Sequence, residues 1–285
     1  MKRLKEAQIA VVGLGLMGGS LAGALRGRCR SVIGVARRAE TVKIARARGL
    51  IDRGAIDLER GVYQADLVVL ATPVRVILHQ LTEIGTFLST GCLLMDLGST
   101  KTQIVAQMEQ LPDHIQPLGG HPMCGKNVSG IAAADPALYQ SCAFVLTPLA
   151  RTSEAAMGLA RAMVEAIGAH PLLLNSRRHD RLAATTSHLP YLLACALVGA
   201  MRKETAADSA ARVVAASGFH DTSRLAASDV TMMLDILSTN REAVLKAMAI
   251  CEAQLHNLAH LVQSGDEERL RATLTDIQKY RRELY

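Results

Sequence analysis

One histidine in this sequence lies in surroundings that suit proton transfer better than core packing. His121 occupies the segment Gly-Gly-His-Pro-Met-Cys-Gly at positions 119–125, directly after a short apolar run. A neutral imidazole can accept a proton near pH 7, and a core histidine seldom lies between flexible glycines and a rigid proline. We therefore predict that His121 is a general base in a loop; the alternative is a purely structural histidine.

Two further polar segments follow apolar runs that are typical of buried strands. Asp-Leu-Gly-Ser-Thr-Lys at positions 96–101 contains Ser99, and Ala-Thr-Pro at positions 71–73 contains Thr72 and Pro73. The carboxyl ends of parallel strands face the ligand crevice, so we expect Ser99 at that crevice and Thr72 near a cofactor. The alternatives are that Ser99 only caps the next helix and that Pro73 only ends its strand in a plain turn.

Two segments in the second half of the chain combine polar groups with helical patterns. Ser-His-Leu-Pro at positions 187–190 interrupts an apolar helical run, and Pro190 predicts a kink that would turn His188 toward a cleft. The alternative is a buried, hydrogen-bonded His188. Gly-Phe-His-Asp-Thr-Ser-Arg at positions 218–224 predicts a polar loop, in which Arg224 binds a carboxylate and Asp221 pairs with a cation as a gate. The alternative is a capping loop with surface charges.

A glycine-rich turn near the N-terminus predicts dinucleotide binding. Gly-Leu-Gly-Leu-Met-Gly at positions 13–18 fits G-x-G-x-x-G, follows an apolar strand pattern and opens a helical one. In such turns Gly13 would permit the tight bend, Gly15 the approach of the pyrophosphate, and Gly18 close helix–strand packing. Leu16 and Met17 would then present backbone N–H groups at the helix N-terminus. A glycine-rich turn without a ligand is the alternative.

The end of the second strand pattern bears on which cofactor is bound. NAD-binding enzymes usually carry an acid there, whereas this chain has Ala36, Arg37 and Arg38. Arginine can bind a 2′-phosphate through two hydrogen bonds, and an acid would repel it. We predict that NADP is preferred and that NAD is possible; the alternative is that Arg37 only stacks on the adenine.

The elements that must position these residues alternate in the first half of the chain. Apolar strand patterns cover 8–12, 31–35, 66–71, 92–97, 115–118, 143–147 and 171–174, and helical patterns cover 16–26 and 39–48. Continuous apolar strands separated by helices predict an α/β domain of the Rossmann type, with a mostly parallel sheet covered on both faces.

From about residue 176 only helical patterns remain. They cover 180–202, 206–216, 230–237, 241–263 and 267–283. We therefore predict a dinucleotide-binding domain over 1–174 and an all-helical domain over 175–285. The second domain has long apolar helices but few residues, so we expect a homodimer that completes its core.

Composition excludes several other classes of protein. The 285 residues are 49% hydrophobic and 20% charged, which is ordinary for a globular protein. Aromatic residues make up 3% with no tryptophan, and the net charge of +6 is mild, so we expect no nucleic-acid partner. The histidines at 256 and 260 lack a third ligand, so we expect no metal. We also expect no signal peptide, no membrane span in the apolar stretch 189–201, and a cytoplasmic location.

The segments around Gly13, Ser99, His121, His188 and Arg224 together resemble the prephenate/arogenate dehydrogenase family of tyrosine biosynthesis, over nearly the whole chain. The resemblance implies a Rossmann domain followed by a helical dimerisation domain. It also implies oxidative decarboxylation of a cyclohexadiene. Hydride leaves C4 for the nicotinamide, His121 accepts the hydroxyl proton, and carbon dioxide departs as the ring becomes aromatic.

The same resemblance implies roles for further residues. Ser99 matches a serine that hydrogen-bonds the histidine or the substrate hydroxyl, and Arg224 matches an arginine that binds a substrate carboxylate. His188, Asp221 and Tyr191 are expected to contact the substrate.

The chain also departs from some family members. Tyr191 stands where some bacterial members have a second histidine, His220 where some have lysine, and Asn127 where some have an acid. Arg37 with Thr41 nearby resembles the arogenate-using, NADP-dependent branch, so both substrates stay open with arogenate favoured.

Two other functions share features with this sequence. A 3-hydroxyacid or 6-phosphogluconate-type dehydrogenase shares this layout and uses a lysine on a helix of the second domain; Lys203 and Lys246 lack the expected glycine-rich neighbourhood. A non-catalytic redox sensor would bind the dinucleotide without needing His121, Ser99 and Arg224 to converge.

Overall fold

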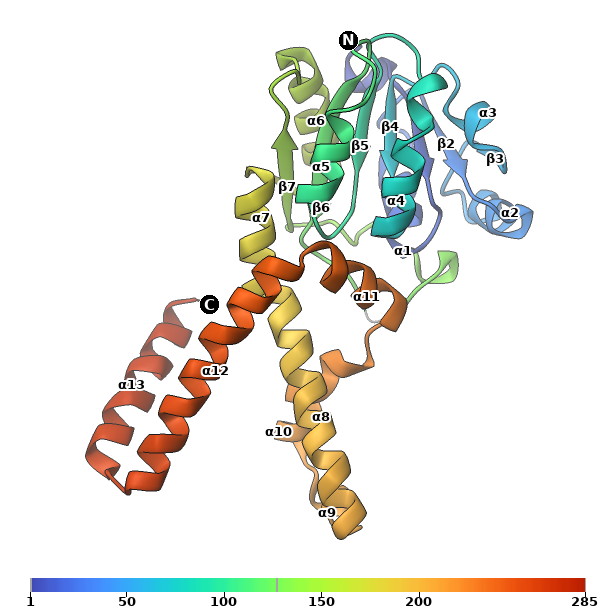
Figure 1. The fold of residues 1–285 in the computed structure, drawn as a ribbon. Helices are drawn as coiled ribbons and strands as arrows, with labels where there is room; N and C mark the ends of the chain where they lie inside the picture. Colours follow the sequence, from blue (N-terminus) through green and yellow to red (C-terminus); the bar gives the residue numbers. More distant parts are fainter. Residues whose placement is uncertain (1, 127, 285) are drawn as a thin grey trace.

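The computed structural model describes residues 2–126 and 128–284, and its N-terminal half is built on one mostly parallel sheet (Figure 1). The sheet has eight strands in the order β3-β2-β1-β4-β5-β6-β7-β8. Their bounds are β1 Gln8–Val12, β2 Ser31–Val35, β3 Arg53–Ala55, β4 Leu67–Leu70, β5 Leu93–Asp96, β6 Gln116–Pro122, β7 Ala143–Pro148 and β8 His170–Leu173. Only the β6–β7 pair is antiparallel in this sheet. The predicted Rossmann-type sheet is therefore confirmed.

Helices cover both faces of this sheet. They are α1 Leu16–Leu25, α2 Ala39–Ala47, α3 Leu58–Val62, α4 Val74–Leu81, α5 Thr102–Met108 and α6 Glu154–Ala166, with short 3₁₀ turns at Leu4–Glu6, Ile84–Thr86 and Ile131–Ala133. Within β1, Ile9 and Val11 pack with α1, α2 and α6, whereas Ala10 and Val12 pack with α3, α4 and α5. The alternation follows from the two-residue period of a strand, and it explains why this strand is apolar throughout.

The carboxyl ends of the parallel strands β1, β4, β5 and β6 lie at one edge of the sheet, which Figure 1 shows facing the helical half of the chain. β6 continues through Pro122, so His121 is part of a strand and the predicted loop is wrong at this position. The extension is possible because Gly120 has no side chain. A Cβ at Gly120 would lie 2.5 Å from the carbonyl oxygen of Asp96.

From Ser176 to Leu284 the chain forms helices and no strand. They are α7 Ser176–Ala183, a π-helical turn η4 Ala184–His188, α8 Leu189–Ala207, α9 Ala211–Val214, α10 Ser217–Ser223, a 3₁₀ turn η5 Arg224–Ala227, α11 Val230–Thr239, α12 Arg241–Ser264 and α13 Glu267–Glu283. Figure 1 shows α8 with α9 and α10, and α12 with α13, as two arms that extend away from the sheet. The fold class predicted from the sequence is confirmed in both halves.

Three local predictions differ from the structure. The sequence predicts a helix over 206–216, but α8 runs on to Ala207 and only Ala211–Val214 of the rest is helical. The break lies at Asp208, whose side chain accepts a hydrogen bond from the N–H of Ala210 at 2.8 Å and competes with the helix. The polar loop predicted over 218–224 is helical and packs against α8, so tertiary contacts override the low helix propensity of this segment. Pro190 lies in the first turn of α8, directly after the π-helical turn, and the helix continues through both.

The apolar stretch 189–201 is part of a longer element than expected. α7, η4 and α8 form one continuous helix of 32 residues, Ser176–Ala207, which is long and apolar enough to cross a membrane by length and composition alone. Core helices of soluble proteins meet the same criterion. Here the helix packs against η5, α10 and α12.

Candidate active site

The glycine-rich turn between β1 and α1 has the geometry that a phosphate site requires. Gly13 adopts a φ of 100°, and its N–H donates to the carbonyl of Val35 at 2.8 Å. A Cβ on Gly18 would lie 1.8 Å from the carbonyl oxygen of Gly13, so only glycine allows this packing. A Cβ on Gly15, by contrast, would meet nothing within 4 Å. The residues fit a dinucleotide, because open space lies at the position where a pyrophosphate approaches such a turn.

The N-terminus of α1 is also free to receive an anion. No side chain among the described residues caps it, so the first N–H groups, from Leu16 and Met17, are not satisfied by a side chain there. The hydroxyl of Tyr139 donates to the carbonyl of Met17 at 2.7 Å and supports the turn from behind.

The other predicted cofactor residues lie around this turn. The methyl group of Thr72 would be 2.8 Å from a Cβ on Gly13, while its hydroxyl donates to Gln80 at 2.7 Å. Pro73 is exposed and precedes α4.

The segment after β2 leaves two arginines accessible. Ala36 donates its N–H to Ala55 at 3.1 Å, and Thr41 donates its N–H to the carbonyl of Arg38 at 3.1 Å. Arg37 and Arg38 are exposed, and neither belongs to an ion pair in the described part of the chain. Both guanidinium groups are therefore available to an anionic ligand.

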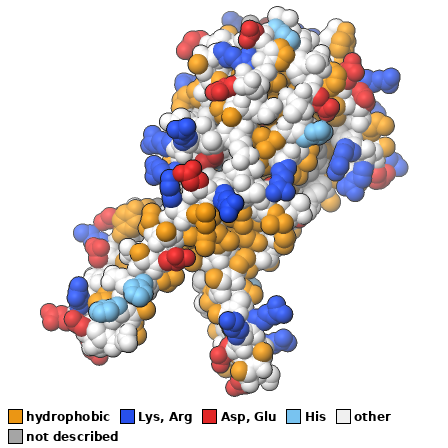
Figure 2. Space-filling view, in the orientation of Figure 1, with side chains coloured by type: hydrophobic (Ala, Val, Ile, Leu, Met, Phe, Trp, Pro, Cys, Tyr) orange, Lys and Arg blue, Asp and Glu red, His pale blue; other side chains and the backbone are white. Residues whose placement is uncertain are grey.

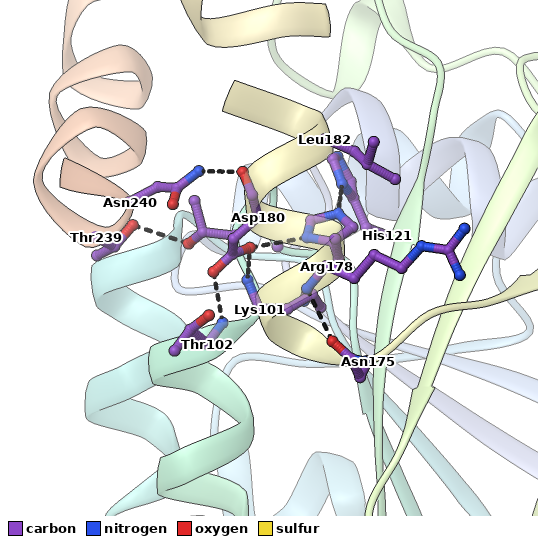
Figure 3. Close-up of polar contacts among 12 residues, drawn as sticks. Lys101, Thr102, His121, Asn175, Arg178, Asp180, Leu182, Thr239 and Asn240 are labelled. Carbon is purple, nitrogen blue, oxygen red and sulfur yellow. Dashed lines mark hydrogen bonds and ion pairs between the residues drawn. The ribbon is translucent and has the colours of Figure 1, made fainter. Parts of the chain in front are cut away.

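A chain of hydrogen bonds connects His121 on β6 to α7 of the helical half. Nδ1 of His121 lies 2.8 Å from Nε2 of His179, and Nδ1 of His179 lies 2.8 Å from Oδ1 of Asp180 (Figure 3). The two imidazole rings meet edge to face, with centroids 5.0 Å apart. His179 and Asp180 are buried, whereas His121 is half-buried. His121 is thus the exposed end of a buried polar chain.

The carboxylate of Asp180 is held by backbone groups of the sheet domain as well. Oδ1 accepts from the N–H of Lys101 at 2.7 Å, and Oδ2 accepts from the N–H of Thr102 at 2.8 Å (Figure 3). Burial on its own would raise the pKa of Asp180, but the hydrogen bonds from His179 and Thr102 outweigh it and hold this pKa below its ordinary value. Asp180 is therefore an anion at neutral pH.

Burial and neighbouring basic groups lower the pKa of His121 well below that of a free imidazole. Loss of hydration is the first cause, followed by the nearby His179, Lys101 and His188. The imidazole of His121 is consequently neutral, and able to accept a proton, at pH 7. Nε2 of His121 makes no hydrogen bond within the described residues, since its only recorded bond is the one at Nδ1.

A second carboxylate joins the segments that carry Ser99 and His121. Asp96, at the end of β5, forms a buried ion pair with the ammonium group of Lys101. Its two oxygens also accept from the N–H of Gly98 at 2.7 Å and from the N–H of Gly120 at 3.1 Å. The turn around Ser99 and the strand around His121 are therefore fixed to the same side chain.

His188 is buried at the end of the π-helical turn. Its Nδ1 lies 3.3 Å from the side-chain nitrogen of Asn240, which also donates to the carbonyl of Asp180 at 2.7 Å. Burial lowers the pKa of His188 to about 4, although Asp180 opposes the shift. Tyr191, one turn further on, is half-buried and hydrogen-bonds Cys195, which raises the pKa of the phenol.

The structure does not bring every predicted site residue into contact. The hydroxyl of Ser99 is half-buried and makes no hydrogen bond to another described residue, and it does not cap α5, whose N-cap is Lys101. Arg224 and Asp221 are exposed, and Asp221 pairs with His220 at 3.4 Å and not with Arg224. Asn127 lies outside the described residues.

Several site residues were missed in the sequence. Asp96 follows three apolar residues of a buried strand, and an acid in that position is a signal of a fixed, functional carboxylate. His179 and Asp180 on α7, and Asn240 between α11 and α12, gave no such signal, because only the packing of these elements against the sheet domain and one another brings them into the site. No group of three or more possible metal ligands occurs in the described ranges.

Comparison with known proteins identifies the chain. A family model described as the nucleotide-binding domain of prephenate dehydrogenase matches residues 21–173, and a second, described as its dimerization domain, matches residues 175–276. The chain belongs to the prephenate dehydrogenase family. It is similar to prephenate dehydrogenase of Lactococcus lactis subsp. cremoris, with 32% identity over 96% of this chain and 76% of that protein.

Solved structures of this family have the same fold. Arogenate dehydrogenase of Synechocystis superposes with a TM-score of 0.86 at 32% identity, over 98% of this chain and 100% of that chain. Prephenate dehydrogenase of A. aeolicus in complex with hydroxyphenyl propionate and NAD+ superposes with a TM-score of 0.88 at 29% identity, over 100% of both chains. This prephenate dehydrogenase family member is an NAD(P)-dependent oxidoreductase with prephenate/arogenate dehydrogenase activity, so the two alternative functions no longer apply.

Proposed function

We propose that this enzyme oxidises arogenate, with prephenate as the second candidate, and that NADP is its preferred cofactor. The observation that carries the proposal is the position of His121 at the carboxyl edge of the sheet. Its Nδ1 is hydrogen-bonded to His179, and Nε2 has no hydrogen-bond partner among the described residues. β6 ends at the same edge of the sheet as β1, which leads into the glycine turn. This nitrogen is suited to accept a proton from the substrate hydroxyl.

The nicotinamide, when bound, supplies the acceptor for the hydride that leaves C4 of the substrate. In this proposal Nε2 of His121 removes the proton of the C4 hydroxyl, and the loss of carbon dioxide then makes the ring aromatic. Ser99, fixed through Asp96 beside the strand of His121, hydrogen-bonds the substrate hydroxyl or His121. Arg224 binds a substrate carboxylate, and His188, Asp221 and Tyr191 complete the substrate contacts.

The preference for NADP rests on the residues after β2. Arg37 and Arg38 are exposed, and they occupy the position where NAD-binding enzymes usually carry an acid. Two guanidinium groups without ion-pair partners favour a phosphate at the 2′ position. The proposed cofactor site comprises Gly13, Gly15, Leu16, Met17, Gly18, Ala36, Arg37, Arg38, Thr41, Thr72 and Pro73.

We also propose a homodimer, in keeping with the match to a dimerization domain. Figure 2 shows hydrophobic side chains gathered on the helical half and where its arms meet the sheet domain. Large apolar side chains are exposed on several of these helices, including Leu193, Val198, Leu234, Leu245, Ile250, Leu255, Val262, Leu274 and Ile277. Exposed apolar area of this extent is typical of an interface with a second copy.

The domain boundary proposed for this chain lies between residues 174 and 175, just after β8. We further propose that the enzyme is cytoplasmic and that it binds no metal, no nucleic acid and no membrane.

One kinetic experiment tests the proposed function. Purified enzyme is assayed with arogenate and with prephenate, each with NADP and with NAD, and formation of the reduced cofactor is followed by its absorbance. We expect the highest kcat/KM for arogenate with NADP. A higher value for prephenate would overturn the substrate assignment, and a higher value for NAD would overturn the cofactor preference.

A further inference from the structure

Asp180 determines which atom is the donor in each hydrogen bond of the chain that ends at His121. The carboxylate of Asp180 can only accept, so Nδ1 of His179 carries the proton of the bond between them. A neutral imidazole protonated at Nδ1 has its lone pair at Nε2. The 2.8 Å contact of that Nε2 with His121 therefore takes its proton from Nδ1 of His121. This leaves the lone pair of His121 on Nε2.

We propose that His179 and Asp180 are positioning residues that hold His121 in the tautomer with a free Nε2 and share the positive charge when His121 accepts the substrate proton. The proposal rests on the proposed role of His121 as general base. The sequence predicted no role for either residue, and neither is hydrogen-bonded to the glycine turn in the described structure.

The charge balance around His121 favours this role for Asp180. The groups that face this chain are His179 and Asp180 on α7, His188 at the end of η4, and Lys101 and Asp96 at the β5–α5 turn. Asp96 is already paired with Lys101. Asp180 is therefore the carboxylate that is left to balance an imidazolium in this chain.

The proton movement needs no other reactant. When Nε2 of His121 gains the substrate proton, the bond between Nδ1 of His121 and its own proton breaks while an N–H bond forms at Nε2 of His179. His179 then becomes an imidazolium hydrogen-bonded to Asp180, and His121 is neutral again. One proton moves along one hydrogen bond, and no electrons are transferred between residues.

A purely structural role for these residues makes different predictions. Asp180 also binds the N–H groups of Lys101 and Thr102, so it could serve only to attach α7 to the sheet domain. In that case substitutions of His179 that leave Asp180 in place would change neither the tautomer of His121 nor the pH dependence of turnover.

Two substitutions of His179 separate the two ends of its ring. In His179→Asn the amide nitrogen replaces Nδ1 and keeps the bond to Asp180, but the contact with His121 is lost. In His179→Gln the amide oxygen replaces Nε2 and still accepts from His121. We expect kcat to fall by about 10²–10³ in His179→Asn and by about 10-fold in His179→Gln, with the affinity for NADP unchanged.

Asp180→Asn tests the charge of the carboxylate. The amide oxygen can take the place of Oδ1, which accepts from the N–H of Lys101 and from Nδ1 of His179, so the tautomers are kept while the negative charge that balances an imidazolium is lost. We expect kcat to fall by about 10²–10⁴ and the acid limb of kcat/KM to move to lower pH. His114→Gln is the control, since His114 is exposed and its ring contacts the carbonyl of Leu88 at 3.3 Å, away from the site.

Nitrogen NMR of ¹⁵N-histidine-labelled full-length enzyme makes the test independent of turnover. We expect His121, assigned by its absence in His121→Asn, to be protonated at Nδ1 in the wild type and in Asp180→Asn, and to populate the Nε2-protonated tautomer in His179→Asn, which lacks the acceptor for Nδ1–H. The proposed function fails if the wild type oxidises neither substrate, and the spectrum still decides the tautomer in that case. Protonation of Nε2 in the wild type, or an unchanged kcat and pH profile in His179→Asn, would overturn the inference.

Discussion

Asp96 and Lys101 form an ion pair from which water is excluded, since both side chains have an exposed fraction of 0%. The pair lies next to the site, because Asp96 also accepts hydrogen bonds from the N–H groups of Gly98, which precedes Ser99, and Gly120, which precedes His121. Burial lowers the pKa of Lys101, although the attraction of Asp96 opposes the shift. Burial of the two charges lowers stability, but the pair holds the two segments that carry Ser99 and His121 in a fixed arrangement.

Removing one partner of this pair should be costly. Lys101→Met keeps the length of the side chain but leaves the carboxylate of Asp96 buried without a counter-charge. We expect the free energy of unfolding to fall by about 3–5 kcal/mol, measured by urea denaturation at constant protein concentration. Lys246→Met is the matched control, because the pair of Lys246 with Glu242 is exposed; it should change stability far less than Lys101→Met does. Equal effects of the two substitutions would contradict the view that Asp96 depends on Lys101.

The proposed base can be removed without breaking its contact with His179. In His121→Asn the amide nitrogen can still donate a hydrogen bond as Nδ1 does, but no proton acceptor takes the place of Nε2. We expect kcat to fall by about 10²–10⁴ while the dissociation constant of NADP, measured by fluorescence titration, stays the same. A variant that keeps wild-type kcat would remove His121 from the mechanism.

Cofactor choice should depend on Arg37. Arg37→Ala removes the exposed guanidinium group that follows β2, so only the binding of a cofactor with a 2′-phosphate should be weakened. We expect the KM for NADP to rise by about 10- to 100-fold, as for a lost charged hydrogen bond, and the KM for NAD to stay nearly constant. Arg161→Ala, an exposed arginine on α6, is the control for a general effect of charge. An equal rise for both cofactors would point to adenine stacking instead.

Arg224 should contribute binding more than chemistry. Arg224→Ala is expected to raise the KM for the cyclohexadiene by about 10- to 100-fold with a smaller change in kcat. Arg212→Ala on the neighbouring helix α9 removes the same exposed charge and should leave both constants unchanged. If KM stays constant in Arg224→Ala, the carboxylate is bound elsewhere.

The sequence predicted those parts of the fold that repeat a local pattern. The strands β1, β2, β4 and β5 and the helices α12 and α13 follow from uninterrupted apolar runs or helical periods with clear ends, such as Gly265, whose φ is 66°. β3 was missed because it has only three residues at the edge of the sheet, and most of them are exposed. The break at Asp208 depends on a single side-chain hydrogen bond, which periodicity does not reveal.

The site residues also fall into those that a local sequence pattern predicts and those that it does not. Gly13, Gly15 and Gly18 could be predicted because each has a steric task within one turn, and the structure gives each the expected surroundings. His121 stood out through its neighbours in sequence. His179 and Asp180 did not, because their importance depends on contacts of 2.7–2.8 Å with residues at least 58 positions away, in the sheet domain.

Stability should depend on pH through His188. Its pKa is lowered by burial to about 4, whereas the unfolded chain has an ordinary histidine pKa of about 6.5. Between these values the unfolded state binds more protons than the folded state, so the free energy of unfolding falls as the pH decreases from about 6.5 to 4. A difference of this size corresponds to a loss of about 3 kcal/mol, and below pH 4 the contribution of His188 is constant.

The experiment compares urea denaturation at several pH values for the wild type, His188→Gln and His170→Gln at one protein concentration. His188→Gln removes the group that binds a proton on unfolding, so the slope of stability against pH should become shallower between pH 4 and 6.5. His170 is exposed on β8, so His170→Gln should leave the slope unchanged. If the slope of His188→Gln equals that of the wild type, His188 already takes up its proton in the folded protein, and its burial does not set the acid limit of stability.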